Sequence, residues 1–586
     1  MNSGAPGRPE SSGWHTYYYL IVGICLALFK HFLVVQLPVE ARDYSVDDML
    51  MVQMAENLVK GQWLGAYSEA TLMKGCFFPL FLAFINKFGL SYLSTLDWLY
   101  CGVCALFVRE IRPVIKRRGS RLLLFAVLLF NPCSFSLTNF QRVYRSSLIL
   151  IQVLCLVALF FGYYIYYRSS SCSAVESNRP KGDPVWYSVA AGCVLWSLWN
   201  TREDSIWLLP FVLTASLLIL REIVILSKKQ NQASKVILRH ALILLMPCMI
   251  LVSGNQVIAQ INQYKYGQRI RLEVSDGNFV RAIKAIYSIK NQENVPYTTV
   301  SSEKLERLFS YSPSLALIRP ELEQQMNLYD KVDRNGQDGE VEDGWFYWGL
   351  KKASYQSGLA DTLPTSQAYW LRVAQELELA AQDPESDLEL QQTMPSALMS
   401  PWREEYWKQL IPTTIQAFDY IVSFKDAEPS IQPSGKAGQE TTRRFEIITN
   451  DFSLYSDGFS NSQIQEEIAR FQPTYMILMR IANIYQTVNR PVFLCSFCAY
   501  LFLLFRYMKK RDRQMAPCLL ILLAMLLSIV VLSAGTAYTH ISAFPAIKCF
   551  YLAGAYPLML AFEFISLTSF IQLVTEEVSM RKQCSP

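Results

Sequence analysis

The sequence predicts an α-helical membrane protein that crosses the bilayer about ten times and carries a mainly α-helical extracytoplasmic domain. Three observations predict this class. Of the 586 residues, 52% are apolar, and they gather into runs of roughly 20, the length that spans a bilayer. Short basic clusters separate many of these runs, as in cytoplasmic loops. One long polar stretch, from about 261 to 473, interrupts the pattern.

Charge and cysteine content argue against other classes of protein. The formal net charge of +5 is too small over this length to indicate a nucleic-acid partner. The 14 cysteines fall mostly in or beside apolar runs, and none lies between 261 and 473. The pairs Cys101/Cys104 and Cys495/Cys498 have the spacing of metal ligands but no polar partner nearby, so we interpret them as buried small side chains.

Apolar segments give the candidate spans in order along the chain. The first is too long for a signal-peptide core and has no cleavage site after it, so we expect it to be retained. The short piece FFPLFLAFINKFG, from Phe77 to Gly89, carries a proline and a lysine and is predicted to lie in the membrane interface. The ten candidate spans lie near 17–36, 91–108, 122–138, 147–167, 186–200, 205–220, 240–259, 491–508, 516–536 and 549–574.

Basic loops predict the orientation of these spans. Loops rich in Lys and Arg run from Arg109 to Arg121, from Lys228 to His240 and from Arg506 to Arg513. All three lie on the cytoplasmic side if both termini are cytoplasmic. On this topology the loop 37–90 and the polar segment 261–473 face outward.

We therefore divide the chain into three parts. They are an N-terminal transmembrane module (1–260) that contains the outer loop 37–90, an extracytoplasmic domain (261–473) and C-terminal transmembrane helices (474–586).

The outer segment is predicted to be a helical domain, because stretches such as SEKLERLFSY have helical periodicity. Its aromatic stretch GWFYWGLKKA, from Gly344, is interpreted either as core packing or as an interfacial or acceptor-binding surface. The segment contains neither cysteine nor an Asn-x-Ser/Thr site, which favours the outer face of a bacterial plasma membrane over an endoplasmic reticulum lumen.

Charged residues on the outer side form the main functional signal. The stretch DYSVDDMLMVQMAENLVKGQWLGAY begins with an acidic cluster, and a helix with Met49 and Val52 on its membrane face would hold this cluster near the lipid headgroups. Lysine and arginine bind phosphate oxygens by charge-assisted hydrogen bonds, so a lipid phosphate is the expected ligand. The charges concerned are Asp47, Asp48, Lys74, Arg142, Arg145, Arg202, Glu203, Asp204 and Lys548.

Several of these charges also have a structural interpretation. Ser45 followed by Asp48 fits a capping box at the start of a helix. Arg202 has Glu203 and Asp204 beside it for a local salt bridge, and Arg142 and Arg145 have side chains long enough to reach the headgroups from a span. These alternatives remain open in the sequence.

The stretch from about 40 to 85 resembles the GT-C superfamily of polyprenyl-phosphate-sugar glycosyltransferases, which includes protein O-mannosyltransferases, the lipid A aminoarabinose transferase and cell-wall arabinosyltransferases. An acidic pair is followed by AENLVKGQWLG and by a lysine before an aromatic, proline-containing apolar run. The resemblance implies that Asp47 is the catalytic base, Asp48 its partner and Lys74 a donor-phosphate ligand. KGCFFPLF lacks the double proline that follows the lysine in some members.

The implied reaction is one inverting displacement, in which Asp47 takes a proton from an acceptor hydroxyl that attacks a sugar linked to polyprenyl phosphate. The acceptor would be a glycan, lipid or protein of the cell envelope. A phosphate leaves as a stable anion, so one carboxylate suffices and no metal is required, although Asp47 and Asp48 could hold a divalent cation. Two alternatives are a transporter or flippase of a lipid-linked glycan and a non-catalytic cell-wall scaffold.

Overall fold

The protein is all-helical in its computed structural model. The structure describes residues 12–583 except 173–182, 230–232, 293–294, 330–339, 395, 397–398, 435–436, 455–460 and 511–514. Parts of two of the basic loops therefore lie outside the described residues. Within these residues there is no β-strand, and extended segments meet only in isolated bridges. One continuous apolar core runs through the helix bundle and into the helices of the outer segment.

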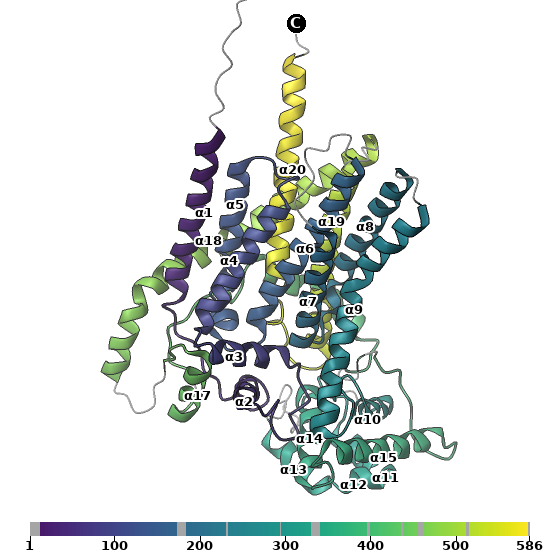
Figure 1. Cartoon of the computed structure of the whole chain (residues 1–586). Coiled ribbons are helices and arrows are strands. Elements are labelled where there is room, and N and C mark those ends of the chain that lie inside the picture. The colour runs from purple at the N-terminus through teal and green to yellow at the C-terminus, as the bar shows by residue number, and fades with distance from the viewer. Residues whose placement is uncertain are drawn as a thin grey trace, which may run out of the picture.

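Ten helices form a bundle (Figure 1). Their two outermost ends, at the start of α1 and the end of α20, lie at the same end of the bundle. The bundle helices are α1 (Ser12–Val34), α4 (Tyr92–Glu110), α5 (Arg118–Leu129), α6 (Ser146–Cys172), α7 (Pro184–Thr201), α8 (Leu209–Lys229), α9 (Ala233–Tyr266), α18 (Asn461–Lys510), α19 (Ala516–Ser542) and α20 (Ala555–Gln583).

The remaining helices lie outside this bundle. Most of them gather at the end of the bundle opposite the two termini, where α2, α3 and α10 to α15 lie (Figure 1). They are α2 (Asp48–Val59), α3 (Phe77–Lys87), α10 (Asn278–Ser288), α11 (Ser302–Tyr311), α12 (Pro313–Ala316), α13 (Arg319–Leu328), α14 (Asp343–Gln356), α15 (Leu363–Gln382), α16 (Tyr406–Val422) and α17 (Gln439–Thr449), with single turns at η1 (Pro132–Ser134), η2 (Leu137–Gln141) and η4 (Ser205–Leu208).

The chain is a multi-pass membrane protein by the length and hydropathy of its helices. Among the described residues, seven helices are long and apolar enough to cross a membrane, and nine spans result if each of two bent helix pairs counts as one. The expected ten are not reached, because the segment 186–200 forms the 18-residue helix α7, which is not among them. Polar residues interrupt α7 and face its neighbours: Gln152 donates to the Ser197 hydroxyl at 3.2 Å and Asn200 to Asn255 at 2.8 Å.

Helix α3 turns sharply across the end of the bundle. It is bent by 112° from α4, with a break of only a few residues between them. Figure 1 shows α3 lying crosswise beneath the upright bundle helices, the orientation expected of an interfacial helix.

Helix α2 packs beside α3, and its apolar face is covered differently from what the sequence predicts. Met49 and Val52 were expected on a membrane face, but both are buried in the protein core. The helix is covered by α3 and by α17, which comes from the far end of the outer segment. Protein packing, and not the bilayer alone, therefore fixes the start of α2.

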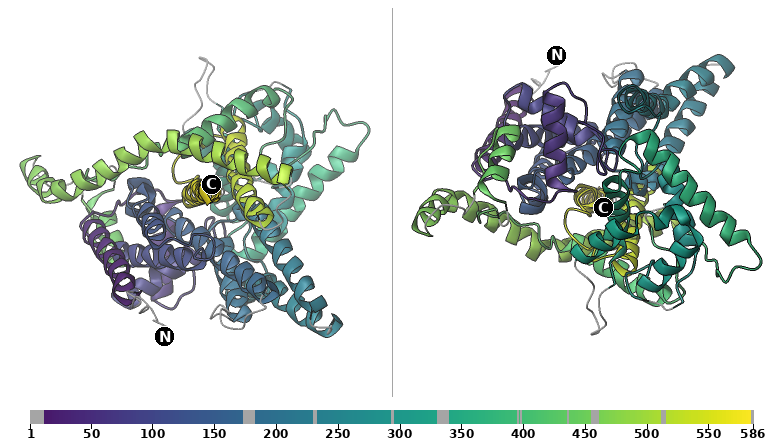
Figure 2. Two further views of the ribbon diagram at one scale, coloured as in Figure 1. Left: turned by 90° about the horizontal axis from the view of Figure 1, so that it is seen from above. Right: turned by 90° about the horizontal axis from the view of Figure 1, so that it is seen from below.

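Two helices run through the boundaries assigned from sequence. Helix α9 continues past residue 261 to Tyr266, and α18 begins at Asn461, before residue 474. The fifty residues of α18 include Pro473 and Pro491, and its first part extends sideways from the bundle in both views of Figure 2.

Candidate functional site

The acidic pair lies at the start of α2, at the end of the bundle that carries the outer helices. Asp47 is the N-cap residue of α2, but its side chain makes no capping hydrogen bond, and Asp48 is the first residue of the helix. The capping interpretation through Ser45 is therefore wrong. The two carboxylates face different partners.

Asp48 is buried and paired with Arg142. Its oxygens accept from Arg142 Nε at 2.7 Å and from Nη2 at 2.6 Å, and the exposed fractions of the two side chains are 0% and 3%. Arg142 reaches this position because the chain after η2 bridges to Glu40, whose N–H donates to the Gln141 carbonyl at 2.8 Å. This fork uses both oxygens of Asp48, so it joins two distant segments of chain. Arg142 does not extend to the headgroups.

Asp47 is the accessible carboxylate, with 39% of its side chain exposed. Its Oδ1 forms a short contact with Lys74 Nζ and accepts from the Tyr144 hydroxyl at 3.0 Å. Its Oδ2 has no hydrogen-bond donor among the residues the structure describes. Burial raises the pKa of Asp47, but the positive charges of Lys74 and then of Arg142 and Arg145 lower it to about 2. Asp47 is thus ionised, with one oxygen free.

Lys74 is directed at Asp47 by the glycine that follows it. A Cβ on Gly75 would lie 2.1 Å from the Asn200 carbonyl oxygen, so only glycine fits this approach to the end of α7. The Gly75 N–H donates to Glu203 Oε1 at 2.8 Å. The Lys74 ammonium also lies 5.9 Å from the ring centre of Trp348, which brings helix α14 of the outer segment to the site. The aromatic stretch that begins at Gly344 thus both packs in the core and contacts the site.

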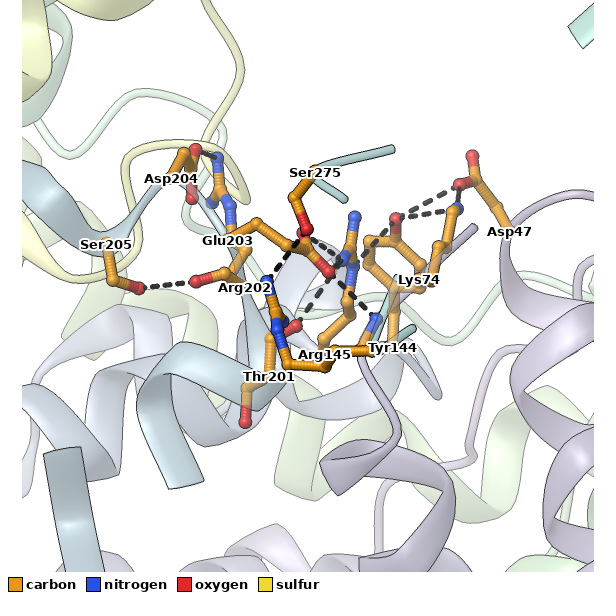
Figure 3. Close-up of polar contacts among 12 residues, drawn as sticks. Asp47, Lys74, Tyr144, Arg145, Thr201, Arg202, Glu203, Asp204, Ser205 and Ser275 are labelled. Carbon is orange, nitrogen blue, oxygen red and sulfur yellow. Dashed lines mark hydrogen bonds and ion pairs between the residues drawn. The ribbon is translucent and has the colours of Figure 1, made fainter. Parts of the chain in front are cut away.

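Arg145 and Glu203 form the next layer (Figure 3). Arg145 Nε donates to the Tyr144 hydroxyl at 3.3 Å, and its Nη1 donates to Glu203 Oε2 at 3.1 Å. Tyr144 therefore links three groups, because Lys74 also donates to its hydroxyl at 3.3 Å. The site is a chain of contacts from Asp47 through Tyr144 to Arg145 and Glu203.

Arg202 and Asp204 lie apart from this chain of contacts. Arg202 pairs with Asp204 at 2.6 Å and donates to the Tyr551 carbonyl at 3.1 Å, so the local salt bridge considered from sequence is present. Figure 3 shows this pair on the opposite side of the cluster from Asp47. Lys548 is exposed and, in the described part of the chain, has no ion-pair partner and no contact with Asp47 or Lys74. The predicted convergence thus holds for Lys74, Arg142, Arg145 and Glu203, but not for these three residues.

Two residues of the site were missed in the sequence. Tyr144 lies between Arg142 and Arg145 and was passed over because it carries no charge. Arg271 follows α9 and belongs to the long outer segment; its side chain is 9% exposed and its charge, like that of Glu203, acts on the Cys76 thiol next to Gly75. Its outward position on the predicted topology was the available signal.

Arg271 has a guanidinium nitrogen without a partner. Its Nη2 donates to the Ser275 hydroxyl at 2.9 Å, but its Nη1 is buried and has no hydrogen-bond acceptor. An unpaired buried donor is costly, and it marks a place where an oxygen of a ligand would be stabilised.

No group of three or more His, Cys, Asp or Glu side chains that could hold a metal ion occurs in the described ranges. Asp47 and Asp48 also do not present a joint set of oxygens, because Arg142 occupies both oxygens of Asp48. The arrangement suits an anionic ligand that bears oxygens: Lys74 and Arg145 belong to one chain of contacts with Asp47, and the charge of Arg271 acts on Cys76, two residues after Lys74.

Comparison with known proteins adds a distant likeness. No protein-family model and no curated protein matches the chain. ArnT from Cupriavidus metallidurans in the apo state is similar with a TM-score of 0.30 and 12% identity, over 83% of this chain and 80% of that one. ArnT from the same organism bound to undecaprenyl phosphate gives a TM-score of 0.29 and 13% identity, over 90% and 77%. Such a likeness carries no argument about chemistry, so the geometry of the site has to carry it.

Proposed function

We propose that the protein is a membrane glycosyltransferase that moves a sugar from a polyprenyl-phosphate donor to an acceptor hydroxyl, with inversion at the anomeric carbon. The single observation that carries this proposal is Asp47: one of its oxygens is held by Lys74 and Tyr144, and the other is free to take a proton. The site lies at the outer surface of a bacterial plasma membrane in this proposal, and the acceptor is a glycan, lipid or protein of the cell envelope.

The cations explain how the donor is held. Lys74, Arg145 and the unpaired nitrogen of Arg271 supply hydrogen bonds and positive charge to the phosphate oxygens. In the transition state negative charge grows on the phosphate as the sugar leaves, and fixed cations stabilise it there.

Donor binding also activates the base in this mechanism. The phosphate competes with Asp47 for the Lys74 ammonium. As Lys74 turns toward the phosphate, the pKa of Asp47 rises from about 2 towards the ordinary value of an aspartate, and its carboxylate becomes a better proton acceptor. Asp47 Oδ2 then removes the acceptor proton while the acceptor oxygen forms the new bond to the sugar.

Asp48 has a supporting role in this scheme. Both of its oxygens are bonded to Arg142, so it offers no oxygen to an acceptor. One free carboxylate is enough, because a phosphate needs no general acid in order to leave. We propose accordingly that no metal is required, and that turnover continues in the presence of EDTA.

Gene disruption and complementation test the function. In cells without the protein, a polyprenyl-phosphate sugar should accumulate, as measured by mass spectrometry of lipid extracts. One substituent should be missing from an envelope polymer, as measured by sugar analysis. Wild-type protein should restore both, and D47N, expressed and inserted at the same level, should restore neither. Full complementation by D47N would overturn the proposal and favour the transporter or scaffold.

A further inference from the structure

Glu273 is a buried carboxylate that joins the first outer loop to the helices of the outer segment. Its side chain is fully buried and pairs with Lys351 of α14 at 2.8 Å. It also accepts from the Tyr67 hydroxyl at 2.8 Å, from Ser366 at 2.9 Å and from Gln367 at 3.0 Å, the last two on α15. All its hydrogen-bonding capacity is used within the protein, so it binds no ligand itself.

The backbone beside Glu273 reaches the proposed donor site in both directions. The Glu273 N–H donates to the Leu72 carbonyl at 2.9 Å, and Lys74 follows Leu72 by two residues. Arg271, with its unpaired Nη1, precedes Glu273 by two residues. This backbone hydrogen bond and the hydrogen bond from Tyr67 to Glu273 together set where Lys74 and Arg271 lie relative to each other.

The composition of this cluster is not explained by stability alone. A buried ion pair contributes little net stability, because desolvation of both charges offsets their attraction, and an apolar pair often serves as well. What the pair and its three neutral donors provide is a fixed geometry. Phosphate recognition needs such geometry, since small displacements of binding groups reduce rates strongly.

We propose that Glu273 is a positioning residue for the donor phosphate: with Lys351 and Tyr67 it holds the loop of Lys74 and the segment of Arg271 in register. This inference rests on the proposed function. It gives the outer helices α14 and α15 a role in donor binding, and not only in acceptor binding.

Two variants disturb the cluster to different degrees. Y67F removes only the hydroxyl that links the first loop to Glu273, so the Glu273–Lys351 pair is kept and folding should be normal. The double variant E273Q/K351M removes both charges together and leaves no unpaired buried ion. The matched control is R281Q/E378Q, which removes an exposed ion pair between α10 and α15 in the same group of helices.

Binding of a polyprenyl monophosphate without sugar is the measured quantity, with purified protein in detergent well below its melting temperature. We expect the Kd to rise several-fold in Y67F and at least tenfold in E273Q/K351M, and to stay within twofold of wild type in R281Q/E378Q. Unchanged binding in both cluster variants would overturn the inference, while the proposed function would stand. A wild-type protein that binds no polyprenyl phosphate would overturn both.

A double-variant cycle separates positioning from a general loss of structure. If Glu273 acts through Lys74, Y67F should weaken binding in the wild-type background but add little in a K74M background. Equal weakening in both backgrounds would mean that the cluster acts independently of Lys74, and would contradict the proposal.

Discussion

Two Lys–Asp pairs occur in different parts of the molecule, and they are built differently. Lys30 and Asp97 join α1 to α4 inside the bundle at 2.5 Å, and both side chains are fully buried. The second oxygen of Asp97 contacts His31 at 3.1 Å. At the end of the bundle, Lys74 and Asp47 form the other pair, but Lys74 and Tyr144 both contact the same oxygen of Asp47, and its other oxygen has no donor among the described residues.

The difference teaches how to separate a structural ion pair from one that is ready for a ligand. Asp97 has a partner on each oxygen and no access to solvent, so nothing could bind there without dismantling the pair. Asp47 is partly exposed and lies in a cluster with a buried guanidinium nitrogen that lacks an acceptor. Unused hydrogen-bonding capacity, and not the presence of the pair, indicates function.

Replacing Asp47 tests the comparison most strongly. D47N keeps the size of the side chain but removes the proton acceptor, so turnover should fall by about 10²–10⁴-fold, the range for loss of a general base. Donor binding should not weaken, because the phosphate no longer competes with a carboxylate for the Lys74 ammonium. D43N, in the same loop and exposed, is the control and should keep wild-type turnover. Normal turnover in D47N would show that Asp47, like Asp97, has only a structural role.

Replacing Lys74 should have the next largest effect. K74M removes a cation from the proposed phosphate site, and loss of one such group lowers turnover by about 10²-fold or more. Both kcat and donor KM should be affected, because the cation acts on bound donor and on the transition state. K60M is a suitable control, since Lys60 is exposed at the end of α2. Steady-state kinetics with the lipid-linked donor would check this.

The Arg271 prediction addresses the unpaired nitrogen directly. R271Q should raise the donor KM by about tenfold, as expected for loss of a hydrogen bond to a charged group, and should leave kcat less changed. R269Q is the control, because Arg269 pairs with Gln256 at 2.8 Å on the surface. Equal effects of the two substitutions would show that the unpaired nitrogen of Arg271 has no special role.

The pH profile should shift in a defined direction. The pKa of Asp47 is lowered to about 2, so it stays ionised in the free enzyme, and the acid limb of kcat/KM from this group should lie well below pH 4. In K74M the largest favourable charge is absent, and the limb should move upward toward about 3.9, the ordinary value of an aspartate. The Lys74–Asp47 pair likewise contributes stability above that ordinary pKa, which is lost as the pH falls toward 2. If the acid limb of kcat/KM does not move in K74M, the charge of Lys74 does not control the pKa of Asp47.

The smallest effect on turnover is expected for the enclosed pair. D97N leaves the Lys30 ammonium buried without its carboxylate, which costs about 3–5 kcal/mol of stability when one partner of a buried pair is removed. The melting temperature in detergent should fall, while the folded fraction should keep its kcat and donor KM. A selective loss of kcat would show that the enclosed pair also takes part in function.

Sequence reasoning predicted the helical bundle well, because hydropathy is a local property of each span. The expected span at α7 is not among the helices that are apolar enough to count, and its Ser, Asn and Thr side chains are satisfied by α6 and α9, a tertiary effect that no window along the chain contains. It also assigned α2 to the membrane face, since an amphipathic pattern does not say whether lipid or protein covers the apolar side.

Charge patterning located much of the site for a similar reason. Lys74, Arg142 and Arg145 depart from the positive-inside pattern, and the structure brings them to the acidic pair. The sequence did not predict that Asp48 is paired and Asp47 is accessible. Arg142 lies 94 positions from Asp48, and nothing in the sequence says which of the two adjacent carboxylates it binds. Arg271 was missed because its position near the first loop depends on a tertiary contact, the hydrogen bond from the Glu273 N–H to the Leu72 carbonyl.

Helix α18 is longer than a membrane is thick, and this affects the position of the protein in the bilayer. Fifty residues of helix measure about 75 Å at 1.5 Å per residue, whereas the hydrocarbon layer is about 30 Å thick. The first part carries Glu466, Glu467 and Arg470 and leaves the bundle sideways, so we expect it to lie along the headgroups and not among the lipid tails. In that position it would fix the depth and tilt of the bundle in the bilayer, and with them the height of Asp47 relative to the headgroups.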